Sequence, residues 1–154
     1  SPSIPSLPQS IIAEINAASR TLTYVNAGHP PGFILAADGQ IRARLRRTGI
    51  PLGMRATLEY AVGPTQCLEP GDLVVLLTDG FEEAVNPAGE TFGSERTLEI
   101  IRTHRAERPP VIIQALYDAV RTFCQGQPQE DDLTAILARV DSEKPDPGKN
   151  WENS

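Results

Sequence analysis

Cysteine, aromatic side chains and long apolar runs are scarce in this chain of 154 residues. Its only cysteines, Cys67 and Cys124, are too few for a disulfide framework or a zinc pattern, and we expect both thiols to be reduced and structural. No apolar stretch approaches the roughly 18 residues of a membrane span, and no basic-apolar signal segment opens the chain. These absences predict a cytoplasmic protein, or the cytoplasmic part of a larger one.

Negative charge is concentrated in the second half of the chain. Residues 1–77 carry 6 basic and 5 acidic side chains, whereas residues 78–154 carry 8 basic and 15 acidic ones. An acidic half suits cation binding and argues against nucleic acid as a partner. Simple solvation of the surface is the alternative explanation of the same excess.

The pattern of apolar residues predicts seven strands and two long helices in one domain. The expected strands span residues 11–16, 21–27, 33–37, 41–45, 57–62, 73–78 and 133–140, and the expected helices span 94–104 and 111–123. Asp38-Gly39 is the strongest hairpin signal. Ser94 is expected to cap the first helix, and Pro109-Pro110 suits the start of the second. This order predicts an α+β fold with mostly antiparallel sheets.

Two groups of carboxylates stand at the ends of apolar runs. Asp79 follows the run 73–78 and is itself followed by Gly80, which lets the backbone turn sharply and approach a ligand closely. Asp131 and Asp132 directly precede the run 133–138. A carboxylate at the exit of a buried strand costs free energy unless it is paired, and a hard-oxygen metal site is the simplest use of this arrangement. The alternative is a strand-end carboxylate that bonds to turn amides.

Six short motifs, spread over residues 11–140, give these carboxylates a context. In chain order they are Tyr24-Val25-Asn26-Ala27-Gly28-His29-Pro30-Pro31, Gly49-Ile50-Pro51-Leu52-Gly53, Leu68-Glu69-Pro70-Gly71-Asp72, Thr78-Asp79-Gly80-Phe81-Glu82-Glu83-Ala84, Gly89-Glu90-Thr91-Phe92-Gly93 and Asp131-Asp132-Leu133-Thr134. Together they resemble the SpoIIE/RsbU-like branch of the metal-dependent Ser/Thr protein phosphatases, the PPM family with the protein phosphatase type 2C fold.

The resemblance implies a fold, an activity and a metal site. The fold is a four-layer α-β-β-α sandwich, and the activity is hydrolysis of phosphoserine or phosphothreonine on a protein such as an anti-sigma-factor antagonist. Two Mn²⁺ or Mg²⁺ ions activate a bridging water in the complete domain, so no protein nucleophile and no further catalytic residue is assigned here. The implied metal ligands are Asp79 and Asp131, with Asp132 as a ligand or as a residue that orients a ligated water.

One departure from the family pattern concerns its first metal-binding motif, an Asp-Val-Ser-Gly-His-Gly-like segment. Residues 1–10 contain no Asp, Glu or His to match it. We therefore expect a disordered leader at 1–10, the C-terminal part of a phosphatase domain at 11–140, and a disordered tail at 141–154. The sandwich would be incomplete, this chain alone inactive, and an exposed sheet edge open to homodimer pairing. A non-catalytic phosphatase-like module that binds a protein partner is the alternative function.

Two further features leave their roles open. His29 is interpreted as structural, because the acid His of the family belongs to the first motif. A basic cluster is interpreted either as a solvated face or as a docking surface for a phosphoprotein; it comprises Arg42, Arg44, Arg46, Arg47 and Arg55. Glu82 and Glu83 are expected to begin a short helix, where they complement its N-terminal dipole.

Overall fold

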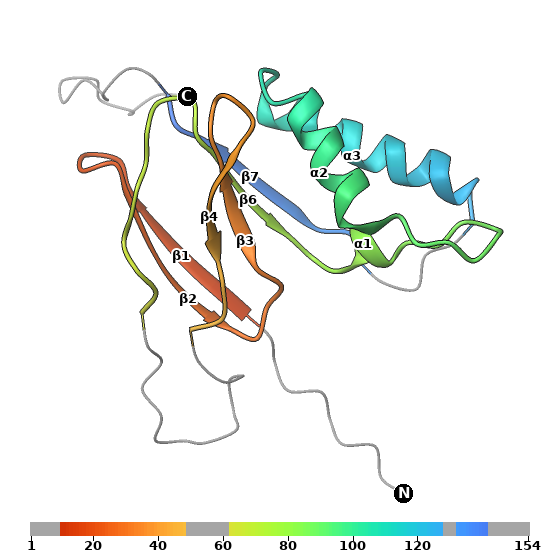
Figure 1. The fold of residues 1–154 in the computed structure, drawn as a ribbon, viewed down its shortest axis with the longest axis horizontal. Helices are drawn as coiled ribbons and strands as arrows, with labels where there is room; N and C mark the ends of the chain where they lie inside the picture. Colours follow the sequence, from red (N-terminus) through yellow and green to blue (C-terminus); the bar gives the residue numbers. More distant parts are fainter. Residues whose placement is uncertain (1–9, 49–61, 128–131, 142–154) are drawn as a thin grey trace, which may run out of the picture.

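The computed structural model describes residues 10–48, 62–127 and 132–141. Two antiparallel sheets lie face to face, and the two long helices cover the outer face of one of them (Figure 1). The strands are β1 (Ser10–Asn16), β2 (Thr21–Ala27), β3 (Gly32–Leu35), β4 (Ile41–Leu45), β5 (Gln66–Cys67), β6 (Leu73–Leu77) and β7 (Ala135–Arg139). The helices are α1 (Gly80–Glu83), α2 (Gly93–Thr103) and α3 (Pro109–Cys124).

Two of the five pairings among the described strands, β1–β2 and β3–β4, are hairpins, as the sequence predicts. The first sheet has the order β1-β2-β5, and the second has the order β4-β3-β6-β7. The β3–β4 turn forms at the expected Asp38-Gly39 pair, where Gly39 has a φ of 90° that favours glycine. β3 ends at Leu35, two residues earlier than expected, because the amide of Ala36 already donates to the carbonyl of Gln40 across the turn.

The core has two compartments, one on each face of the second sheet. Leu22, Tyr24, Ile34, Leu45 and Val74 are buried between the two sheets. On the other face, Val75 packs with Phe81 of α1 and with side chains of α2 and α3, including Ile101, Ile112 and Leu116. β6 contributes to both compartments, which explains its continuous apolar run. In the described residues the layers are therefore β-β-α, the incomplete sandwich that was expected.

The helices differ from the prediction at one boundary. Ser94 does not cap α2: the helix begins at Gly93, Phe92 occupies the cap position, and no side chain bonds there. The Thr97 hydroxyl instead donates to the carbonyl of Gly93 within the first turn. α3 begins at Pro109, in the Pro109-Pro110 pair expected at its start, and ends at Cys124; the following residue, Gln125, has a left-handed φ of 52°. No helix in the described part of the chain is long and apolar enough to cross a membrane.

Two other expectations and one omission concern short or undescribed segments. The strand expected at 57–62 falls almost entirely on residues 49–61, outside the described residues, as do residues 1–9 of the leader expected at 1–10 and most of the tail. Ser10, the last residue of that expected leader, instead begins β1, where it pairs with Ala27. β5 was not predicted, because two residues are too few for a periodic pattern. It forms because Gln66 and Cys67 pair with Leu22 and Thr21 at the start of β2.

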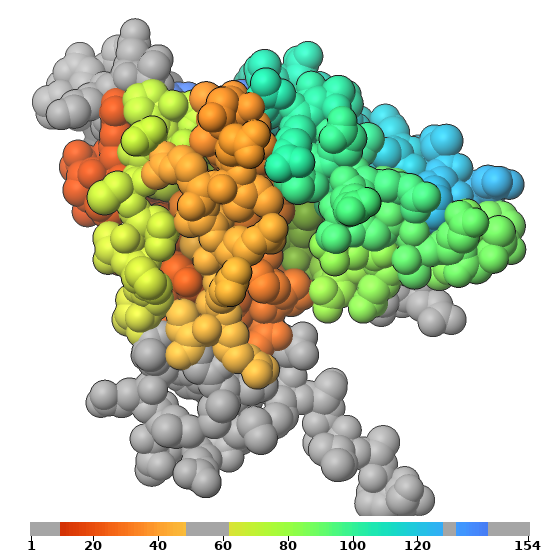
Figure 2. Space-filling model, in the orientation of Figure 1, coloured from red at the N-terminus to blue at the C-terminus, as the bar shows by residue number. Residues whose placement is uncertain are grey.

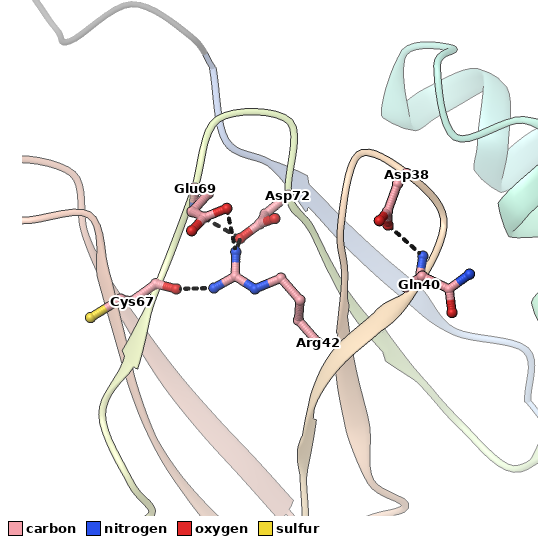
Figure 3. Close-up of polar contacts among 6 residues, drawn as sticks. All are labelled: Asp38, Gln40, Arg42, Cys67, Glu69 and Asp72. Carbon is pink, nitrogen blue, oxygen red and sulfur yellow. Dashed lines mark hydrogen bonds and ion pairs between the residues drawn. The ribbon is translucent and has the colours of Figure 1, made fainter.

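Arg42 joins the edge strand of the second sheet to the loop that leads into β6 (Figure 3). Its guanidinium donates to the carboxylate of Asp72, which is only 1% exposed, and to the carbonyl of Cys67. The amide of Glu69 also donates to Asp72, over 2.8 Å. Arg42 therefore belongs neither to a solvated face nor to a docking surface, because its charge compensates a buried carboxylate.

Candidate functional site

Asp79 lies at the junction of β6 and α1. It occupies the cap position of α1, but its side chain makes no capping hydrogen bond, and the residue is exposed. The short helix is held beneath it by Phe81, which is fully buried and packs against Tyr117 of α3 with ring centroids 5.4 Å apart. The carboxylate is thus presented on a rigid element without a role in capping α1.

The segment that enters β7 lies directly beside Asp79. β6 and β7 are antiparallel neighbours with Leu77 opposite Ala135, so the exit of one strand adjoins the entry of the other. Beyond the ladder, the Thr78 hydroxyl donates to the carbonyl of Asp132 over 3.0 Å. The two apolar runs that carry the candidate carboxylates at their ends are therefore neighbouring strands.

Gly80 permits this close approach. A Cβ atom at Gly80 would lie 2.6 Å from the carbonyl oxygen of Asp132 and 3.0 Å from a methyl group of Leu133. The glycine therefore serves contact between two backbone segments of the protein. Its predicted approach to a ligand stays a prediction.

The predicted metal ligands are only partly covered by the structure. Asp79 and Asp132 are both described and exposed, whereas Asp131 lies outside the described residues. No group of three or more His, Cys, Asp or Glu side chains gathers within the described ranges. The exposed carboxylates of Asp79 and Asp132 offer hard oxygens, which suit Mg²⁺ or Mn²⁺. They fit one part of a metal shell, and the proximity of Asp79 to Asp131 stays a prediction.

A groove of about 670 Å³ opens next to Asp79. Its walls come from the segment after β2, from β3 and β4, from the β6–α1 junction and from the start of α2. The polar side chains among its lining residues are His29, Arg44, Arg47, Thr78, Asp79, Glu82, Ser94, Glu95 and Thr97. Figure 2 shows the face on which the orange β3–β4 region meets the green α2 region.

The charges in this groove influence one another. Burial raises the pKa of the Glu82 carboxyl above its usual value, the nearby Asp79 raises that pKa further, and Arg44 opposes both effects. His29 is half-buried, and its Nδ1 lies 2.8 Å from the carbonyl oxygen of Pro30. Its placement beside the groove could not be read from the sequence, because segments far apart in the chain build these walls.

Comparisons with known proteins agree on one family. Residues 9–141 match the family model described as "Stage II sporulation protein E (SpoIIE)". Protein IcfG of Synechocystis is 31% identical over 79% of this chain, and phosphoserine phosphatase RsbU of Bacillus subtilis is 30% identical over 82%. The chain spans 19% and 37% of the lengths of these two relatives.

A solved structure gives the same result for the fold. The SiaA-PP2C domain of Pseudomonas aeruginosa superimposes with a TM-score of 0.64 at 27% identity. The match covers 79% of this chain and 47% of that domain. The two-sheet arrangement with helices on one side is therefore shared with a phosphatase-type domain.

Proposed function

The chain belongs to the SpoIIE family, and from that premise we propose that it forms part of a metal-dependent phosphatase domain that hydrolyses phosphoserine or phosphothreonine in proteins. The observation that carries the proposal is the position of Asp79. Its exposed carboxylate stands where the exit of β6 meets the entry of β7, at the edge of a groove. Among the described residues only the exit of β6 lines the groove, but the entry of β7 lies beside it, and carboxylates at two adjacent strand ends suit a shared cation better than two unrelated turn residues.

The proposed metal ligands are Asp79 and Asp131, with Asp132 as a ligand or as a residue that orients a ligated water. When bound, Mn²⁺ or Mg²⁺ ions supply charge neutralisation for the phosphate and a more acidic water at neutral pH. The protein's own contribution is rigidity. Phe81 anchors α1, while Thr78 and Gly80 hold the entry of β7 against the exit of β6.

The proposed substrate is a signalling phosphoprotein such as an anti-sigma-factor antagonist. Support comes from the name of one relative, phosphoserine phosphatase RsbU, and from the size of the groove, which exceeds the volume of a single phosphate. We also propose a cytoplasmic location, because both cysteines are free thiols and reducing compartments keep thiols in this form.

A homodimer through a sheet edge is proposed as well. β1 ends the first sheet among the described strands, and its Ile12 and Ile15 are 69% and 46% exposed. An edge strand of this kind can pair with a second copy. Light scattering coupled to size-exclusion chromatography tests this, and a monomer at all concentrations would contradict it.

The activity is tested in a protein that joins residues 1–154 to an Asp-containing first metal motif. We expect hydrolysis of a phosphoserine protein that requires Mn²⁺ or Mg²⁺ and is lost with EDTA. Asp79→Asn should reduce turnover by about two orders of magnitude or more, because one ligand charge is removed. Asp118→Asn, which changes an exposed carboxylate on α3 away from the groove, is the matched control.

Two results would contradict the proposal. Turnover unaffected by Asp79→Asn would remove the assignment of the site. Tight binding of a phosphoprotein without any metal-dependent hydrolysis would favour the alternative, a non-catalytic phosphatase-like module.

A further inference from the structure

Two arginines line the groove without a direct hydrogen-bonded partner among the described residues. Arg44 and Arg47 both line it, and neither makes a hydrogen bond or ion pair with the part of the chain that the structure describes. Other arginines are engaged: Arg42 compensates Asp72, and Arg102 donates to the carbonyl of Gly39. Carboxylates of Asp79, Glu82 and Glu95 line the same groove, and Arg44 lowers the pKa of Glu82, but neither arginine is held by a direct ion pair within the described ranges. Their guanidinium donors are therefore free to bind an anionic ligand.

The segment that carries these two arginines is held in place by a buried asparagine. Asn26 is 0% exposed, and its Nδ2 donates to the carbonyl of Leu45 over 2.9 Å. The backbone amide of Thr48 donates to the carbonyl of Asn26, and the Thr48 hydroxyl accepts from the Asn26 amide, both over 2.9 Å. The chain is therefore fixed at positions 45 and 48, on both sides of Arg47 and just after Arg44.

The strand order places this basic wall within reach of the proposed metal site. Arg44 lies opposite Phe33 of β3, and β3 separates β4 from β6. Two strand spacings amount to about 10 Å, a distance that one extended arginine and one substrate residue can bridge together. Arg44 is also close enough to Glu82, next to Asp79, to lower the pKa of that carboxyl.

We propose that Arg44 and Arg47 bind oxyanions of the substrate's phosphoserine segment while the phosphoserine itself reaches Asp79. This inference rests on the proposed function and adds to it the residues that select the substrate. Guanidinium groups bind phosphate and carboxylate oxygens in a bidentate manner, so both a phosphoryl group and acidic side chains next to it meet the requirement. The groove volume of about 670 Å³ can hold more than one residue, which favours an extended segment of a protein.

Binding, measured apart from turnover, tests the inference on residues 1–154. The probe is a fluorescein-labelled peptide with one phosphoserine between two aspartates. Its binding is measured by fluorescence anisotropy, first in EDTA and then with Mn²⁺. Two further peptides replace the phosphoserine by serine or the aspartates by asparagine. The variants are Arg44→Gln/Arg47→Gln and the matched control Arg46→Gln, which removes an exposed charge that does not line the groove. Circular dichroism melting checks that each variant is folded.

We expect the double variant to weaken peptide binding about tenfold or more, while Arg46→Gln changes it less than about twofold. If the double variant no longer weakens binding of the serine peptide, the two arginines contact the phosphoryl group. If it no longer weakens binding of the asparagine peptide, they contact the flanking carboxylates. Equal weakening by the double variant and by Arg46→Gln, or no binding by the unaltered chain, would overturn the inference. Binding that depends on the two arginines without metal-dependent hydrolysis would contradict only the proposed activity.

Discussion

Thr78 and Asp132 are 54 residues apart in the chain, and the hydroxyl of Thr78 donates a 3.0 Å hydrogen bond to the carbonyl of Asp132. The same hydroxyl accepts a 3.0 Å hydrogen bond from the amide of Thr134. One side chain thus fastens the entry of β7 to the exit of β6. We expect the distance between the proposed metal ligands to depend on this contact.

Replacing Thr78 tests that dependence. Thr78→Val keeps the shape of the side chain but removes both hydrogen bonds and leaves the Thr134 amide without this acceptor. We expect a loss of about 1–2 kcal/mol in the free energy of unfolding, measured by urea titration. In a protein that carries the first metal motif, the concentration of Mn²⁺ needed for half-maximal turnover should rise. Thr78→Ser keeps the hydroxyl and should change neither quantity appreciably.

Gly80→Ala should disturb the same contact by steric means. Its Cβ would meet the backbone oxygen of Asp132 at 2.6 Å, and a backbone atom cannot give way cheaply. We expect destabilisation of about 1–3 kcal/mol together with weaker metal-dependent turnover. Gly89→Ala is a useful comparison, because Gly89 has open space around it and a φ of 81°. It should cost stability through backbone strain alone and leave turnover unchanged.

The ion pair between Arg42 and Asp72 should matter more than a surface pair. Arg42→Met leaves the buried Asp72 carboxylate with only the backbone amide of Glu69 as a donor among the described residues. We expect the free energy of unfolding to fall by about 2–4 kcal/mol, because the substitution leaves a buried carboxylate without its counter-charge. Arg121→Met breaks a pair with Asp118 whose side chains are 73% and 57% exposed, and should cost less than about 1 kcal/mol. Equal losses in chemical denaturation would contradict the structural role assigned to Arg42.

The two thiols should differ in reactivity. Cys67 is exposed, whereas Cys124 is buried under the helices, and burial raises the pKa of its thiol. Because the thiolate is the reactive form, Ellman's reagent should label one thiol per chain quickly and the second only after unfolding. The raised pKa also means that the unfolded state loses this proton first, so stability should fall as the pH rises past about 9. Cys124→Ala should remove that part of the pH dependence.

Local patterns predicted much of the fold. The closely spaced strands expected at 11–16 and 21–27 and the Asp38-Gly39 turn correspond to two hairpins, and the apolar runs before Asp79 and after Asp132 form the neighbouring strands β6 and β7. Contacts between distant segments could not be predicted in this way. The partner of Arg42, Asp72, lies 30 residues away in the sequence. The pattern of the strand that carries Arg42 is that of any half-exposed strand.

The groove could not be predicted from the sequence for the same reason. Its basic residues were visible in the sequence as a cluster, but only the strand order β4-β3-β6 places Arg44 and Arg47 on the same groove as Asp79. Arg42, in the same cluster, turns out to compensate a buried charge. Arginines at neighbouring positions therefore have different roles, because segments that are distant in the sequence place different groups next to each of them.

The central claim is that Asp79 and Asp131 hold one metal ion between the ends of β6 and β7. The most direct measurement is a crystal structure of the domain with its first metal motif, soaked in Mn²⁺ and recorded with anomalous diffraction. We predict an anomalous peak with carboxylate oxygens of Asp79 and Asp131 at about 2.1–2.2 Å from the ion, typical of Mn²⁺ or Mg²⁺ sites. Carboxylates of Asp79 and Asp131 more than about 10 Å apart, beyond the reach of one shared ion, would contradict the account.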